Sequence, residues 1–267
     1  MNTLLILGIA HVIGDYLLQW RKLAENKEKS GKALLLHGFL YAAAMGLVFL
    51  CGPWQRTLLA WGILAVTHGL IDCLRVKADK RWNGPRARLI SFCLDQLLHL
   101  GMIVLCWVLL LRGQRTAWLP ALAARSWFRP ALLHTALLCV IWQPAAILVR
   151  KVLAMLPPPE APKAETPEDA AEPLEPVPQK PTEEPEKPME PEADFRSGEL
   201  IGKLERVIVA ALVLSGAATA IGFVLTAKSV ARFKQMEDRN FAERYLVGTL
   251  LSVSVALAAA LLVKHFL

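Results

Sequence analysis

Histidine and aspartate recur at a four-residue spacing in three apolar stretches of the sequence. The pairs are His11 with Asp15, His68 with Asp72, and Asp95 with His99. A spacing of four places both side chains on one face of a helix. Neutral imidazole nitrogens and carboxylate oxygens are the usual protein ligands of zinc, and mixed sets of them also suit iron and manganese. The three pairs therefore favour a site for a divalent metal ion, with zinc as the first choice.

A fourth apolar stretch adds a single histidine, His37. The candidate metal ligands are then His11, His37, His68, His99, Asp15, Asp72 and Asp95. This set exceeds the four ligands of an ordinary zinc ion, so it allows either two metal ions or outer carboxylates that orient ligating histidines. Two neutral side chains, Gln19 and Gln96, are candidates for positioning a substrate.

The same residues have a second interpretation. His–Asp hydrogen bonds could simply join the helices, or they could form a proton relay. In the metal interpretation, Asp15, Asp72 and Asp95 are either ligands or a general base. Residue types and spacing leave these alternatives open.

The elements that carry these residues are long and apolar. Hydrophobic residues make up 55% of the chain, above the ~45–50% of a soluble domain. A membrane-spanning helix needs about 20 mostly apolar residues, and backbone groups in hydrocarbon must pair within their own element. We therefore predict an all-α, polytopic transmembrane bundle of about seven helices. The predicted spans are 2–20, 33–51, 57–75, 89–111, 131–150, 201–226 and 245–266.

One internal stretch interrupts this pattern. Residues 157–197 hold 12 of the 17 prolines, together with 12 acidic and four basic residues. Proline removes hydrogen-bond donors and the acids repel one another, so this composition predicts a disordered linker. It divides a five-helix membrane domain (1–156) that holds the His/Asp residues from a two-helix membrane segment (198–267).

Basic residues cluster in short segments between the predicted spans. Residues 21–32 contain five lysines and arginines, and residues 75–88 contain six. Under the positive-inside rule these two loops are cytoplasmic, which indicates a cell inner membrane and anionic lipids rather than nucleic acid as the partner. All the candidate ligands lie one to three turns from these loops. The topology of 112–129 and 228–244, and the oligomeric state, stay undetermined.

The remaining polar residues have plainer interpretations. Residues 228–245 read as an amphipathic connecting helix, and Glu205 beside Arg206 reads as a structural charge pair near the interface. The isolated His134 and His265 are expected to be structural. The five cysteines have no CxxC spacing and are expected to be small buried hydrophobic residues.

Several segments together resemble a known bacterial membrane family. They are HVIGDYLLQ, AENKEK, LLLHGFLY, THGLIDCLRVK and FCLDQLLHL, and within residues 4–110 they resemble the family catalogued as domain of unknown function 3307. The rear segments IGKLERVIV and DRNFAERYLVGTLLS are similar to the tail of its longer members. Histidines and aspartates in membrane helices are also distantly similar to membrane-bound metal-dependent hydrolases.

Two functions fit this sequence. One is a membrane-embedded metal-dependent hydrolase that acts on a lipid, a lipid-linked molecule or a membrane peptide at the cytoplasmic leaflet. The other is a metal or proton transporter, or a metal-sensing scaffold, without catalysis. An ion path should continue across the membrane, and the predicted front helices have almost no ionisable residue in their opposite half. The sequence does not decide whether any reaction occurs.

Overall fold

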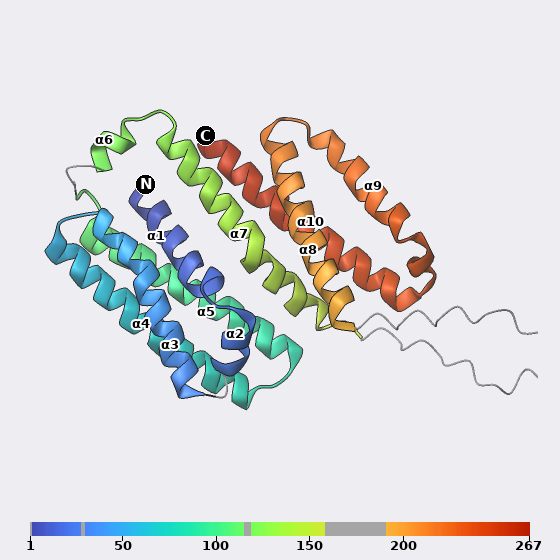
Figure 1. Cartoon of the computed structure of the whole chain (residues 1–267), viewed down its shortest axis with the longest axis horizontal. Helices are drawn as coiled ribbons and strands as arrows, with labels where there is room; N and C mark the ends of the chain where they lie inside the picture. The colour runs from blue at the N-terminus through green and yellow to red at the C-terminus, as the bar shows by residue number, and fades with distance from the viewer. Residues whose placement is uncertain (1, 28–29, 115–118, 158–190) are drawn as a thin grey trace, which may run out of the picture.

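The computed structural model describes residues 2–27, 30–114, 119–157 and 191–267 (Figure 1). Every regular element in these ranges is helical, which confirms the predicted all-α class. The α-helices are α1 (Asn2–Val12), α2 (Arg21–Lys27), α3 (Gly31–Met45), α4 (Trp54–Arg81), α5 (Pro85–Cys106), α6 (Leu119–Ala123), α7 (Phe128–Leu153), α8 (Pro191–Leu214), α9 (Ile221–Ala231) and α10 (Arg239–Phe266). Shorter π or 3-10 turns extend several of them: η1 (Ile13–Leu17), η2 (Gly46–Leu50), η3 (Trp107–Leu111), η5 (Ala218–Ala220) and η6 (Phe233–Glu237).

Five of these helical segments are long and apolar enough to cross a membrane. They are Gly31–Leu50, Trp54–Arg81, Pro85–Leu111, Phe128–Leu153 and Arg239–Phe266. Large apolar side chains cover their outer faces, with Leu35, Phe39 and Leu97 each more than 60% exposed. A water-soluble protein rarely exposes so much apolar surface, and a lipid environment accounts for it.

The helix α7 lies between two groups of helices (Figure 1). It packs against α1 and α5 on one side and against α8 and α10 on the other. The front group, α1 to α5, encloses a core that includes Leu7, Met45 and Ile103. A second apolar cluster joins Ile141 of α7 to Val213 of α8 and to α10. The division into domains 1–156 and 198–267 stays a prediction.

The predicted span 201–226 is wrong, because the chain turns in its middle. Gly216 has φ of +80°, which glycine adopts without steric penalty. The amide of Ala217 donates to the carbonyl of Leu212 and that of Gly216 to Val213, at 2.8 and 3.2 Å. This pair of bonds is a Schellman motif, which ends a helix. The chain consequently returns as the separate, shorter helix α9.

The predicted connecting helix 228–245 is also wrong. Its first residues end α9, and the η6 turn follows. The carboxylate of Asp238 then accepts from the amides of Asn240 and Phe241 and begins α10, which is the usual role of an N-cap aspartate. Of the predicted linker, residues 158–190 lie outside the described residues, while 191–197 already belong to α8.

Candidate metal centre

The seven predicted ligands lie together inside the front group of helices. His11 is on α1, Asp15 on η1, His37 on α3, His68 and Asp72 on α4, and Asp95 and His99 on α5. Each is at most 4% exposed. The i, i+4 spacing explains the four residues on α4 and α5, whose short connection makes the two helices antiparallel neighbours. Metal binding by these residues stays a prediction, because proximity alone does not show it.

The four imidazole rings form a row. The ring centroids of His37 and His68 are 5.1 Å apart, those of His68 and His99 are 4.5 Å apart, and those of His99 and His11 are 5.4 Å apart. The Nε2 atoms of His37 and His68 approach to 3.1 Å. Four buried imidazoles in such a row place several lone pairs in one small volume.

Asp15 reaches this row because of an irregular helical turn. Residues Ile13–Leu17 form a π-helix in which the amide of Leu18 donates to the carbonyl of Ile13 at 2.9 Å. Such turns are rare and occur often at functional sites. Gly14 allows the close approach of this turn to α3, since a Cβ there would lie 3.1 Å from the Cα of Tyr41. The Oδ1 atom of Asp15 thereby lies 3.3 Å from Nε2 of His37.

Asp72 lies at the His37 end of the row. Its Oδ2 atom is 3.1 Å from Nε2 of His37 and 3.6 Å from Nε2 of His68. The same oxygen accepts a 2.9 Å hydrogen bond from the ammonium group of Lys27. Lys27 is on α2 and only 7% exposed, so α2 places a buried cation beside the cluster.

Asp95 lies at the edge of the cluster. Its Oδ2 atom accepts from Arg75 and from Gln96, both at 3.0 Å, and its Oδ1 atom is 3.8 Å from Nδ1 of His99. Gln96 also donates to Asp15 at 3.0 Å, so this predicted polar residue does join the cluster. Arg75 also lies 3.7 Å from the carboxylate of Asp79, so its guanidinium pairs with two aspartates.

Gln19 does not join the cluster. The helical segment ends at Leu17, so the spacing of four from Asp15 no longer keeps Gln19 on the same face. Its side chain is partly exposed in the turn before α2 and makes no hydrogen bond to the cluster within the described part of the chain. His134 and His265 are exposed and lie outside the cluster, on α7 and α10.

Two buried residues of the site are missing from the sequence prediction. Lys27 is one, and Tyr41 is the other. The Tyr41 ring stacks on His68 at a centroid distance of 3.5 Å, and its hydroxyl lies 3.3 Å from Nδ1 of His11. The signal that could have found Tyr41 is its spacing of four residues from His37, the same spacing as in the His–Asp pairs.

Several buried polar atoms of the cluster have no hydrogen-bond partner among the described residues. They are Nδ1 of His37, Nδ1 of His68, both ring nitrogens of His99, Oδ1 of Asp72 and Oδ1 of Asp95. Unsatisfied buried polar atoms are costly and require an explanation. A cation bound to one nitrogen of His99 and to a carboxylate oxygen would satisfy part of this set.

The net charge of the buried residues also favours a bound cation. Four buried aspartates, Asp15, Asp72, Asp79 and Asp95, face the two cations Lys27 and Arg75. With neutral imidazoles this leaves two negative charges uncompensated. Buried charges are normally paired or bound to metal. One divalent cation, or two protons on imidazoles, would restore neutrality.

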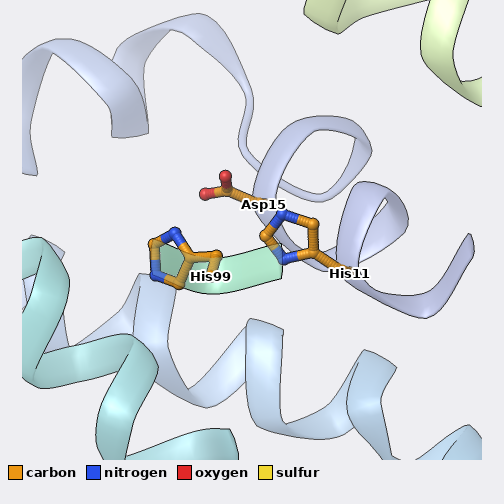
Figure 2. A group of neighbouring side chains, drawn as sticks. All are labelled: His11, Asp15 and His99. Carbon is orange, nitrogen blue, oxygen red and sulfur yellow. The ribbon is translucent and has the colours of Figure 1, made fainter. Parts of the chain in front are cut away.

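Three groups of side chains bring their ligand atoms within 4.8 Å of one another. The groups are His11, Asp15 and His99; Asp15, His37 and His68; and His68, Asp72 and His99. Figure 2 shows the first group, with the side chains of His11, Asp15 and His99 close together. The donor set suits zinc, iron or manganese, so these residues fit a divalent metal ion.

Comparison with known proteins identifies a family for this part of the chain. Residues 3–129 match the profile of the family described as "Protein of unknown function (DUF3307)", which confirms the resemblance noted within residues 4–110. No curated protein and no solved structure matches the chain. The description of the family names no activity.

Proposed function

We propose that this chain, of which residues 3–129 match the DUF3307 profile, is a membrane-embedded, metal-dependent hydrolase. The observation that carries the proposal is a set of six buried His and Asp side chains that form three overlapping groups of three, each group with its ligand atoms within 4.8 Å of one another. Buried ionisable residues at membrane depth are costly and usually functional. Zinc is the first candidate, followed by iron and manganese.

A bound divalent ion would polarise a carbonyl or phosphoryl oxygen and activate water. Asp15 with either His11 and His99 or His37 and His68 would hold such an ion. Asp72 is the best candidate for the general base, because its Oδ1 atom is buried and without a partner while Oδ2 is fixed by Lys27. Asp95 is the second candidate, held by Arg75 and Gln96.

The position of the cluster supports a substrate that enters from one membrane face. Lys27 of α2 and Arg75 near the end of α4 both reach it. These residues belong to the basic segments 21–32 and 75–88, which we place in the cytoplasm on the inner membrane. A lipid, a lipid-linked molecule or a membrane peptide in the inner leaflet would meet the site from there.

A transporter is the second candidate function. Its polar residues should continue to the opposite membrane face. Beyond the cluster, however, the front helices are packed by apolar side chains such as Leu7, Val48, Ala60 and Leu111. This apolar packing favours a site open to one side, and with it the hydrolase.

Asp72→Asn tests the catalytic role directly, since an amide cannot act as a base. We expect the metal-loaded variant to keep its fold and most of its metal, and to lose at least ~10²-fold in turnover, as expected for loss of a general base. The measurement is hydrolysis of lipid, lipid-linked and peptide substrate libraries by the detergent-purified protein. Asp238→Asn, at the remote N-cap of α10, is the matched control. A stoichiometric metal without hydrolysis of any substrate would favour the transporter or sensor.

A further inference from the structure

Four imidazoles and one shared carboxylate divide into two overlapping metal-ligand groups. We call His11, Asp15 and His99 the His11 site, and Asp15, His37 and His68 the His37 site. Asp15 belongs to both. We propose that the cluster holds two divalent metal ions bridged by the carboxylate of Asp15, one ion in each site. This inference rests on the proposed metal-binding function and deepens it.

One ion cannot use all four histidines. Metal–nitrogen distances of ~2.0–2.1 Å require the ligand atoms of one ion to lie within about 4 Å of each other. None of the groups within 4.8 Å that the described residues form contains both His11 and His37. These two histidines lie at opposite ends of the ring row, separated by His68 and His99. A single ion would therefore leave one end of the row without a metal.

At both ends of the row of histidine rings, nitrogen atoms are placed where a cation could bind. At the His37 site, the Nε2 atoms of His37 and His68 lie 3.1 Å apart, and Nε2 of His37 lies 3.3 Å from Oδ1 of Asp15. At the His11 site, both nitrogens of His99 have none, although the ring is only 2% exposed. His11 contacts Tyr41 and Gln96 at 3.3 and 3.4 Å, so it can bind an ion through one nitrogen and keep one of these neighbours.

The carboxylate of Asp15 is placed to connect the two sites. Its Oδ1 atom lies 3.3 Å from Nε2 of His37, and a carboxylate oxygen of Asp15 also lies within 4.8 Å of a ring nitrogen of His11 and of His99. A carboxylate has two oxygens, and two-metal sites hold their ions ~3.5–4 Å apart. The third group of ligands, His68, Asp72 and His99, spans the two sites and places Asp72 beside the pair.

Metal stoichiometry tests this inference. The full-length protein is loaded with Mn²⁺ or Zn²⁺ in detergent, desalted and measured by elemental mass spectrometry. We expect about two ions per wild-type chain, about one each for His11→Ala and His37→Ala, and the largest loss for Asp15→Asn. His134→Ala, an exposed histidine on α7, is the control and should keep two.

A second readout does not depend on the variants folding. Two Mn²⁺ ions bridged by a carboxylate give an exchange-coupled electron paramagnetic resonance spectrum, whereas separate ions give isolated six-line signals. One ion per wild-type chain, with an uncoupled spectrum, would overturn the two-ion inference and leave the proposed metal function intact. No bound ion would overturn both.

Discussion

Tyr41 connects the histidines of the cluster at the level of single residues. Its ring lies parallel to that of His68, at an interplanar angle of 1°, and its hydroxyl reaches His11. Such a neighbour fixes the orientation of a ligating imidazole without touching the metal. Tyr41 is therefore a positioning residue for His68 and His11.

Two substitutions separate the roles of its ring and its hydroxyl. Tyr41→Phe keeps the stacking on His68 and removes only the contact with His11, so we expect a small loss of metal affinity. Tyr41→Leu removes both, and we expect metal affinity to fall by ~10–100-fold, the usual cost of losing an outer-sphere partner. Titration with Co²⁺, followed by its visible absorption spectrum, measures affinity and ligand geometry together. Equal affinities for the two variants would show that stacking does not orient His68.

The candidate ligand residues are predictable from the sequence because a helix repeats its face every three to four residues. The same periodicity says nothing about side chains from other elements. Lys27 meets Asp72 from 45 residues away, and its loop reads only as a basic cytoplasmic segment. Gln19 is wrongly included in the predicted site. Its spacing of four from Asp15 assumes a regular helix, but the helical segment ends at Leu17.

At the level of elements, the π-turn η1 sets the position of Asp15. Its packing against α3 depends on Gly14, whose missing Cβ would meet the Cβ of Ala44 at 3.2 Å. The spacing of apolar residues in the sequence cannot reveal a π-turn, because its i→i+5 hydrogen bond alters a single helical turn. The helix break at Gly216 is equally hidden, since the residues on both sides of it are apolar.

Gly14→Ala tests the importance of this close approach. The added methyl group should displace η1 from α3, at a cost of ~1–3 kcal/mol typical of overpacking, and move Asp15 away from His37. We expect lower thermal stability and weaker metal binding. Gly8→Ala, on α1 with nothing within 4 Å of the new Cβ, is the control. Unchanged metal affinity in Gly14→Ala would show that the position of η1 is not critical.

At the scale of the whole molecule, Arg206 of α8 joins α8 to α7 and α10 through hydrogen bonds. Its guanidinium is 3% exposed and donates to the carbonyls of Ile141 and Trp142 and to the hydroxyl of Ser252. These carbonyls lie in the turn before Pro144 of α7. The sequence interpretation of Glu205 and Arg206 as an interfacial pair is incomplete, because Glu205 pairs with Lys228 instead, at 2.5 Å.

Arg206→Met should lower the stability of the protein without changing metal binding by the proposed site. It removes three hydrogen bonds from a charged donor, worth ~1.5–3 kcal/mol each, while the front cluster shares none of them. We expect a lower midpoint of thermal unfolding and an unchanged metal content. Arg239→Met, which removes an arginine with a 90% exposed side chain, should change neither. A loss of metal in Arg206→Met would indicate that the rear helices control the front site.

The metal content of the purified protein tests the central claim, that the buried His/Asp cluster binds a divalent ion, most directly. The full-length chain is incubated with Zn²⁺, Fe²⁺ or Mn²⁺ in detergent, desalted and measured together with His68→Ala, because His68 belongs to two of the three ligand groups. We expect at least about one tightly bound ion per wild-type chain and a loss of more than about half of it in His68→Ala, with the helical circular dichroism retained. A wild-type protein that binds none of these metals, or a variant that binds as much as the wild type, would contradict metal binding by this cluster.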